Sequence, residues 1–247
     1  MRTETLPRRL TAEFIGTAML LAAVVGSGIM GDRLAGGNGA IALLANTLAT
    51  GAALVTLILT FGPVSGAHFN PAVSVADATQ GGLSPAAAVA YCLVQCAGGM
   101  VGVALAHVMF ELPLFSLSTH LRSGTSQIVS EGVATFGLLA VIWSASRRRS
   151  AAVPFAVGAY ITAAYWFTAS TSFANPAVTL ARAFTDTFSG IRPADVPGFV
   201  GGQVVGAAAA TALFRWLIPT LPESADRVVV PHGSATLPEV HDAIRDL

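Results

Sequence analysis

The sequence predicts an all-α membrane protein with six transmembrane helices and two re-entrant half-helices, arranged as an inverted 3+3 repeat. Three observations predict this fold. The chain of 247 residues has a mean hydropathy of +0.68, with 53% hydrophobic and 11% charged residues. This composition leaves too few polar groups to cover a soluble globule. Six apolar segments approach the length of a membrane span, and an Asn-Pro-Ala-Val motif occurs twice.

The six apolar segments are judged by length, because a helix needs about 20 residues to cross the hydrocarbon core of a bilayer. The segments near that length are residues 10–30, 40–61, 86–110, 127–146, 151–168 and 196–218. Two further apolar segments, residues 68–79 and 173–184, are too short to cross. We expect both to be half-spans.

Clusters of arginine predict the orientation of the chain. Arg8 and Arg9, with Arg2, precede the first span, and residues 147–149 follow the fourth. Basic residues concentrate on the cytoplasmic side of membrane proteins, and an even number of spans places both clusters there. We therefore expect a multi-pass protein of the cell (inner or plasma) membrane, surrounded by the lipid bilayer, with both termini in the cytoplasm.

The two halves of the chain match in order. The corresponding elements are Glu13 and Glu131, Asn70-Pro71-Ala72-Val73 and Asn175-Pro176-Ala177-Val178, and Gln95 and Gln203. Three spans per half is an odd number, so the second half must be inverted relative to the first. Each half then brings its short helix into the membrane from the opposite side. Pairs of glycines four residues apart, Gly98 with Gly102 and Gly202 with Gly206, predict close packing of the third and sixth spans.

An Asn-Pro sequence is a strong helix start, because Asn caps a helix well and Pro is tolerated in the first turn. If two such helix N-termini meet near the bilayer centre, their partial positive charges would oppose the passage of cations and protons. The passage of neutral solutes would be unaffected. The Asn amides can donate hydrogen bonds to a passing oxygen, and backbone carbonyls of residues 65–69 and 171–174 can accept them. A single motif would more often be a capped turn. Two equivalent copies argue against that interpretation.

The segment Ser65-Gly66-Ala67-His68-Phe69-Asn70-Pro71-Ala72-Val73, with its second motif, resembles the bacterial type of the major intrinsic protein family of aquaporins and aquaglyceroporins. The resemblance covers residues 8–218. It implies a homotetramer with one pore in each subunit and facilitated diffusion without energy coupling. It also implies that Glu13 and Glu131 hydrogen-bond the backbones of the re-entrant loops; a proton-relay role is the alternative.

The domain organisation follows from the same resemblance. Residues 1–218 would form the channel domain, with repeat halves of about 8–112 and 125–218. Residues 219–247 are polar and would form a flexible cytoplasmic tail, with a short helix over 237–247.

The sequence departs from the family at the narrow filter, where members usually carry Arg three residues after the second Asn. Here that position is Val178. The family's spacing places the other filter positions on Thr50, Ser172 and either Ala163 or Tyr165, depending on how the fifth span is aligned. With Ala163 the filter would be wide and uncharged, and with Tyr165 it would be narrower.

Arg182 lies seven residues after Asn175, which returns it to within about 20° of the same helix face. Its backbone would be about 6 Å further out than the usual site, so we expect a vestibule charge. The hypothesis is that charge has moved outward and the filter has relaxed, favouring solutes larger than water. Asp77 occupies the mirrored place and would put the opposite charge at the other mouth. Polar helix ends near the headgroups are the alternative explanation.

These observations favour a passive channel for small uncharged solutes, namely polyols such as glycerol and metalloid acids such as arsenite, with some water. A strict water channel is the close alternative, which the width of the filter decides. A coupled secondary transporter would need a buried titratable pair on the substrate path. A structural or adhesive protein is disfavoured by the absence of long extracellular loops.

Other classes of function find little support in the sequence. His68 and His107 stand alone on apolar segments, so we expect no enzyme activity. The 13 basic and 13 acidic residues balance, which argues against nucleic acid, and no dinucleotide, P-loop or zinc spacing indicates a cofactor or metal. Cys92 and Cys96 are too few for a disulfide framework.

Overall fold

The computed structural model describes residues 4–148 and 150–219. Its helices are α1 (Leu6–Leu34), α2 (Gly39–Ser65), α3 (Pro71–Gln80), α4 (Pro85–Met109), α5 (Thr125–Arg148), α6 (Val153–Phe167), α7 (Pro176–Arg182) and α8 (Val196–Leu217), with 3-10 turns at Ser150–Ala152 and Pro193–Asp195. Nearly all of the predicted tail, including the helix over 237–247, lies outside the described residues.

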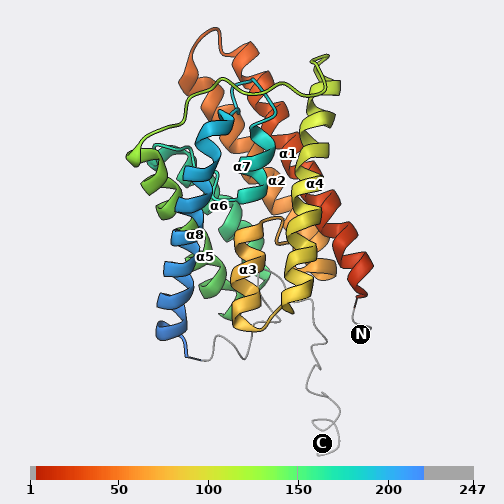
Figure 1. The fold of residues 1–247 in the computed structure, drawn as a ribbon, viewed down its shortest axis with the longest axis vertical. Helices are drawn as coiled ribbons and strands as arrows, with labels where there is room; N and C mark the ends of the chain where they lie inside the picture. Colours follow the sequence, from red (N-terminus) through yellow and green to blue (C-terminus); the bar gives the residue numbers. More distant parts are fainter. Residues whose placement is uncertain (1–3, 149, 220–247) are drawn as a thin grey trace, which may run out of the picture.

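The long helices run side by side along the length of the molecule, and the short helices α3 and α7 lie among them (Figure 1). Helix α3 occupies the lower half in this view and α7 the upper half. The beginning of α1 and the end of α8 lie at the same end of the bundle, which we call the terminal end. The α1–α2 and α4–α5 connections lie at the opposite end, which we call the distal end.

The predicted inverted repeat is visible in the packing of the helices. In the first half, α1 packs against α2 and α4, and in the second half α5 packs against α6 and α8. Helix α2 also packs against α6 and joins the halves. The arrangement is the predicted one of two sets, each with three helices of the outer bundle and one short helix.

Glycines allow the closest of these helix contacts. A Cβ atom on Gly102 would lie 2.2 Å from the carbonyl oxygen of Ala18 in α1, and one on Gly206 would lie 2.1 Å from that of Gly132 in α5. Real Cβ atoms essentially never come so close. The close packing predicted from the glycine pairs of α4 and α8 is therefore confirmed.

The lengths of the spans differ in detail from the prediction. Five helices in the described ranges are long and apolar enough to cross a membrane. The sixth, α6, has 15 residues and follows a 3-10 turn. It begins at Val153, where Pro154 lies in the first turn, a position that suits proline. Helix α2 continues through Pro63 to Ser65, past its expected end at residue 61. Proline is tolerated inside transmembrane helices where other groups compensate the freed backbone carbonyl.

The two short helices begin at the predicted residues. The side chain of Asn70 accepts a hydrogen bond from the backbone N–H of Ala72, and that of Asn175 accepts from Ala177 and Val178. Each Asn is thus an N-cap, followed by Pro in the first turn. Both Asn-Pro motifs therefore act as helix starts, as predicted.

Candidate functional site

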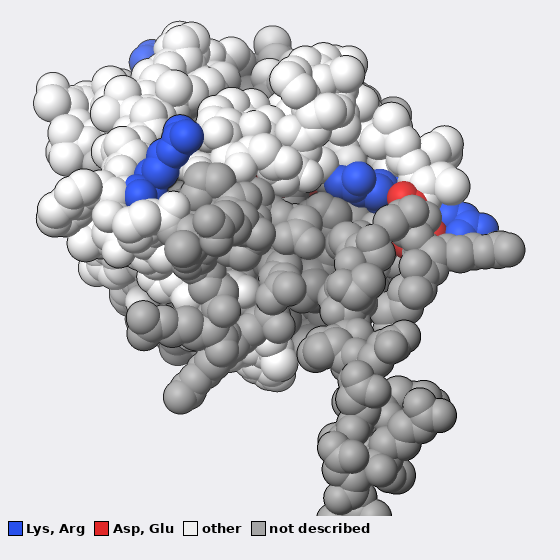
Figure 2. Space-filling view, turned by 90° about the horizontal axis from the view of Figure 1, so that it is seen from below, with Lys and Arg blue, Asp and Glu red and all other residues white. Residues whose placement is uncertain are grey.

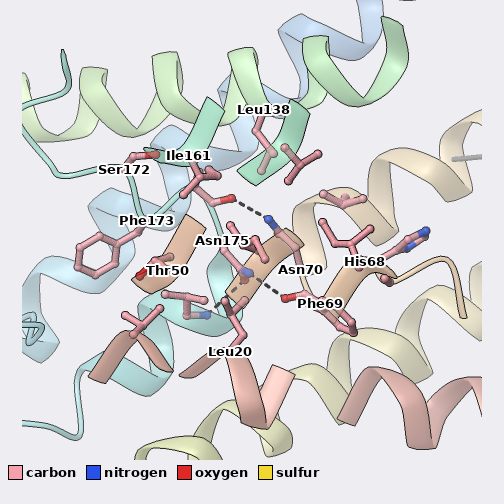
Figure 3. Close-up of a pocket in the computed structure, with 18 of the residues that line it drawn as sticks. Leu20, Thr50, His68, Phe69, Asn70, Leu138, Ile161, Ser172, Phe173 and Asn175 are labelled. Atoms are coloured by element: carbon pink, nitrogen blue, oxygen red, sulfur yellow. Dashed lines mark hydrogen bonds between the residues drawn. The ribbon is translucent and has the colours of Figure 1, made fainter. Parts of the chain in front are cut away.

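The two Asn-Pro-Ala motifs meet in the interior and are cross-linked by hydrogen bonds. The Asn70 amide nitrogen donates to the carbonyl of Ala174 at 2.8 Å, and the Asn175 amide nitrogen donates to the carbonyl of Phe69 at 2.8 Å (Figure 3). An amide nitrogen has two N–H groups, so each Asn keeps one for another acceptor. Both side chains line the same internal cavity.

The loops that lead into the short helices have unusual backbone geometry. Positive φ angles of 48–59° occur at Ala67, Phe69, Thr171, Ser172 and Ala174. Such left-handed conformations cost roughly 1–2 kcal/mol for a residue with a Cβ atom, so other contacts must hold these loops. The carbonyls of Phe69 and Ala174 are among those predicted to serve a solute, and each already accepts one hydrogen bond from an Asn side chain, which leaves it one further lone pair.

Glu13 holds the first loop. Its Oε1 atom accepts from the Ser65 hydroxyl at 2.6 Å and the His68 N–H at 3.0 Å. Its Oε2 atom accepts from the Phe69 N–H at 2.7 Å and the Gln95 amide at 2.8 Å. All four partners donate, which suits an ionised carboxylate, a group that only accepts. Glu13 is fully buried, so it acts as an anchor for the loop backbone.

Glu131 holds the second loop in the same way. Its Oε1 atom accepts from the Phe173 N–H at 2.9 Å, and its Oε2 atom accepts from the Ala174 N–H at 2.8 Å and the Gln203 amide at 2.6 Å. The Gln203 amide nitrogen also lies 2.8 Å from the Thr179 hydroxyl in the first turn of α7. The carboxylate, the glutamine and the short helix therefore form one network, which Gln95 and Ser74 repeat in the first half.

The internal cavity is small, with about 60 Å³ open to water-sized molecules, enough for only a few of them. Its wall is mostly aliphatic (Figure 3). The polar side chains that line it are Thr50, His68, Asn70, Tyr165, Ser172, Asn175 and Arg182. A few polar groups in an apolar passage suit a small solute with both C–H and O–H surfaces.

Four of the five predicted filter residues lie at this cavity: Thr50, Tyr165, Ser172 and Val178. The Tyr165 hydroxyl donates to the Thr50 hydroxyl at 3.3 Å. The expectation that Ala163 lines the filter is wrong, because Ala163 is exposed on the outer surface of the chain. It lies two residues from Tyr165, about 200° around the helix, so only one of the two can face inward.

Arg182 is not in an open vestibule, which corrects the prediction. Only 2% of its surface is exposed, and it lines the same cavity as Val178. Side chains in a helix point back toward its N-terminus, so the long arginine side chain recovers part of the distance that its backbone loses. Its Nε atom donates to the carbonyl of Ser189, and its guanidinium carbon lies 3.4 Å from the ring centroid of Phe173.

Arg122 is a site residue that the sequence analysis missed. It belongs to the α4–α5 connection at the distal end, and its guanidinium lies 4.9 Å from the ring centroid of Phe173. It donates to the carbonyls of Gly190 at 2.8 Å and Ser170 at 3.2 Å. Burial lowers its pKa to about 10, so it stays charged at neutral pH. Its local sequence carries no motif, and only the folded loop reveals its role.

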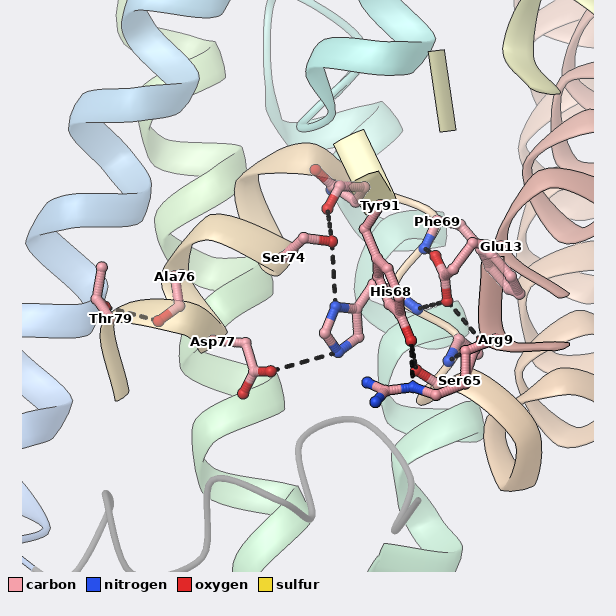
Figure 4. A network of polar contacts seen from close by, with 12 residues as sticks. Arg9, Glu13, Ser65, His68, Phe69, Ser74, Ala76, Asp77, Thr79 and Tyr91 are labelled. Carbon is pink, nitrogen blue, oxygen red and sulfur yellow. Dashed lines mark hydrogen bonds and ion pairs between the residues drawn. The ribbon is translucent and has the colours of Figure 1, made fainter. Parts of the chain in front are cut away.

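The terminal half of the cavity carries the mirrored set of residues. His68 lies where Phe173 lies in the other half, and its Nδ1 atom is 3.1 Å from the Ser74 hydroxyl (Figure 4). Its Nε2 atom lies 3.9 Å from Asp77. Asp77 is fully buried and so is not at an open mouth, contrary to prediction. The Tyr91 hydroxyl donates to the Ser65 carbonyl at 3.0 Å and accepts from Arg9 at 2.7 Å.

Metal ligands do not gather in the described part of the chain, where no three His, Cys, Asp or Glu side chains come close enough to hold an ion. Cys92 and Cys96 are free thiols on α4. The site is therefore built from two amides, two anchored carboxylates and a small number of other polar groups.

Comparison with known proteins gives consistent matches. A family profile described as "Major intrinsic protein" matches residues 1–172, which include only the first Asn-Pro-Ala motif. The chain is 58% identical over 218 residues to "Aquaglyceroporin AqpS" of Rhizobium meliloti (strain 1021), covering 88% of this chain and 93% of that protein. It is 30% identical over 245 residues to "Lens fiber major intrinsic protein" of Gallus gallus, covering 94% and 90%.

A solved structure shares the fold. The aquaglyceroporin from Plasmodium falciparum superposes with a TM-score of 0.69 at 18% identity, covering 88% of this chain and 99% of that one. At this identity the likeness concerns the fold alone. It spans both halves of the inverted repeat.

Proposed function

The chain belongs to the major intrinsic protein family, and we propose that it is a passive channel for small uncharged solutes, such as glycerol and the neutral form of arsenite, with some water. The single observation that carries the proposal is the pair of Asn amides that line one cavity between the N-termini of α3 and α7. Helix N-termini carry partial positive charge, so cations and protons are opposed there. A neutral solute meets no such barrier and can accept from the two amides.

The relatives and the cavity support a solute larger than water. One relative at high identity is an aquaglyceroporin by name, and a shorter match at 30% identity is "Glycerol uptake facilitator protein" of Streptococcus pneumoniae. Val178 takes the place where family members usually carry Arg, so this part of the wall is apolar and uncharged. The mostly aliphatic wall suits the carbon side of a polyol, and the few donors suit its hydroxyls.

We further propose that Thr50, Tyr165, Ser172 and Val178 form the filter and that Arg182 supplies its positive charge. The Nη1 atom of Arg182 and the hydroxyl of Ser172 are buried and have no hydrogen-bond partner within residues 4–148 and 150–219. Both residues line the cavity. Buried donors without partners are costly, so a passing hydroxyl that pairs with them is favoured there.

A strict water channel is the second candidate, and one contact favours it. The hydrogen bond between Tyr165 and Thr50 joins α6 to α2 across the cavity wall. If this bond persists during transport, it holds the Tyr165 side chain against Thr50 and disfavours solutes wider than water at that level. The measurements below separate the two functions.

The orientation and assembly are proposed from the same family membership. We place the terminal end in the cytoplasm of a cell membrane protein, since Arg8 and Arg9 lie at that end and basic residues favour the cytoplasmic side. Figure 2 shows this end, where blue basic side chains of the described residues lie on the surface and a red acidic side chain lies beside those on the right. We also propose a homotetramer with one pore in each chain, a channel domain over residues 1–218, and structural roles for Glu13 and Glu131.

The proposal is tested by stopped-flow light scattering on proteoliposomes, which measures the permeability to water, glycerol and arsenite. The wild type should pass all three, and Val178→Arg should suppress glycerol and arsenite more than water. Arg182→Leu should let monovalent cations pass, because it removes the charge at the filter. Ala163→Ser, on the outer surface of the chain, is the control and should leave every permeability unchanged.

Two outcomes would contradict parts of the proposal. A wild type that passes water but neither glycerol nor arsenite is a strict water channel. An Arg182→Leu variant with unchanged ion exclusion and solute preference would show that Arg182 has no part in the filter. Neither result alone would remove the chain from the class of passive channels.

A further inference from the structure

A second cavity lies on the outside of the bundle, behind the Asn-Pro-Ala motifs. It offers about 760 Å³ to water-sized molecules, far more than the central cavity. Its wall is formed by α3, the start of α7 and one face of α8. The residues that line it include Pro71, Ala72, Pro176, Ala208, Thr211 and Arg215. We call this cavity the α3–α8 groove.

The groove is a break in the symmetry of the inverted repeat. By the offsets of the repeat, the contact between α3 and α8 corresponds to that between α7 and α4. Helix α7 packs closely on α4, because a Cβ atom on Gly99 would lie 3.2 Å from the Cβ of Ala181. Ala207 stands at the position equivalent to Gly99, and Ala76 stands at that of Ala181. The extra methyl group of Ala207 opposes an equally close approach of α8 to α3.

The side chain next in sequence enlarges the gap. Met100 in α4 packs against the main apolar core, whereas the equivalent position in α8 is Ala208. Ala208 is exposed and lines the groove. A long, adaptable side chain thus occupies this position in α4, whereas the matching position in α8 carries only a methyl group and borders the groove.

The surroundings of the groove determine what can enter it. Two residues of its lining, Val75 and Val204, are 53% and 56% exposed. Helix α8 lies within a segment that is long and apolar enough to cross a membrane. The groove therefore opens onto the hydrocarbon of the bilayer, where an acyl chain is the available filling. Polar groups occur only toward the terminal end. The Thr211 hydroxyl has no hydrogen-bond partner among the described residues, and Arg215 lies one turn further on.

We propose that the α3–α8 groove binds one anionic phospholipid of the leaflet at the terminal end. Its acyl chain lies along Ala208 against Pro71 and Pro176. Its ester carbonyl accepts from Thr211, and its phosphate pairs with Arg215, about 6 Å further along the helix axis. Trp216, which is 76% exposed, stands beside the phosphate at the level where aromatic residues meet the headgroups. Basic groups at this depth favour anionic lipids.

The bound chain would support the pore from behind. Pro71 and Pro176 directly follow Asn70 and Asn175, the two amides that line the central cavity. Helix α3 packs on α4 but makes a looser contact with α8 than α7 makes with α4, and the acyl chain fills the space between α3 and α8. Lipid binding itself does not depend on the function proposed above; the effect on permeability rests on it.

The test is native mass spectrometry of the full-length protein, titrated with phosphatidylglycerol or phosphatidylcholine. The wild type should retain one phosphatidylglycerol per chain in preference to phosphatidylcholine. Ala208→Met introduces the side chain of the equivalent position in α4 and should reduce retention by occupying the part of the groove against which the acyl chain lies. Arg215→Gln should reduce the preference for phosphatidylglycerol about five-fold, the effect of one basic residue near a headgroup.

Ala209→Met is the matched control, because Ala209 lies on the face of α8 toward α5 and outside the groove. It should leave the preference for phosphatidylglycerol unchanged. Equal retention by Ala208→Met and the wild type would overturn the site, as would equal loss in Ala209→Met. A change in oligomer mass with Ala208→Met, without a change in lipid retention, would assign the groove to contacts between chains and also overturn the proposal.

A second measurement separates lipid binding from transport. Glycerol permeability is compared in vesicles with and without phosphatidylglycerol. Wild type should be more permeable when the lipid is present, and Ala208→Met should not respond to it. A wild type that binds the lipid but passes no glycerol in either vesicle would refute the proposed passage of glycerol while leaving the lipid site intact.

Discussion

Replacing Glu131 by Gln should destabilise the second re-entrant loop severely, although the two side chains have nearly the same shape. The carboxylate accepts three hydrogen bonds, from Phe173, Ala174 and Gln203. A Gln side chain has one accepting oxygen, and its NH₂ group would face at least one donor. One buried N–H without an acceptor costs about 1–3 kcal/mol, and each remaining bond loses about 1 kcal/mol of charge assistance. The total is about 4 kcal/mol.

The measurement is the unfolding temperature of the purified protein in detergent. For a chain of this size, 1 kcal/mol corresponds to about 2–4 °C, so Glu131→Gln should unfold about 10 °C below the wild type. Glu4→Gln is the control, since Glu4 forms a partly exposed ion pair with Arg8 at 3.0 Å. Such pairs contribute about 0–1 kcal/mol. A decrease no larger than that of Glu4→Gln would refute the view that the carboxylate holds the loop.

Three further predictions concern the packing, the distal loop and the filter. Gly206→Ala should lower the free energy of unfolding by about 3 kcal/mol, because α8 must move away from α5. Gly201→Ala is the control: Gly201 has open space around it, so the change should raise the free energy of unfolding by up to about 1 kcal/mol. Thermal unfolding measures both effects, and equal effects would contradict the packing argument. Burial and two neighbouring arginines lower the pKa of His120 in the α4–α5 connection, so protonation of His120 opposes folding. As the pH falls from about 8 to about 5, the wild type should lose more stability than His120→Gln. Identical pH profiles of the unfolding temperature would contradict this. Tyr165→Ala should raise the permeability to polyols larger than glycerol in light scattering, whereas Ala163→Leu should not, and the reverse result would restore Ala163 to the filter.

The sequence predicts most where local chemistry decides the structure. Both short helices begin at the predicted Asn-Pro steps, because the Asn cap and the Pro in the first turn act within a few residues. The glycine pairs of α4 and α8 predicted close helix contacts for a similar reason, since a missing Cβ atom is visible in the sequence.

Contacts between distant segments could not be predicted in the same way. Arg122 reaches Phe173 through the fold of a connection that has no motif of its own. Arg182 was placed from its backbone alone, and the length of its side chain brings its charge back to the cavity. The choice between Ala163 and Tyr165 depended on the rotation of α6, which a 3-10 turn and Pro154 set at the beginning of the helix.

The crossed hydrogen bonds between the motifs also bear on how the chain is made. When the ribosome has synthesised α1 to α4, Asn70 is already in the chain. The carbonyl that accepts the hydrogen bond from its amide belongs to Ala174, which follows 104 residues later. The carbonyl of Phe69 must likewise wait for Asn175, 106 residues later. Neither half of a nascent chain can complete its own side of the constriction. A chain truncated before the second motif can therefore insert helices into the membrane without forming the pore. Permeability to solutes requires that synthesis has passed the second motif.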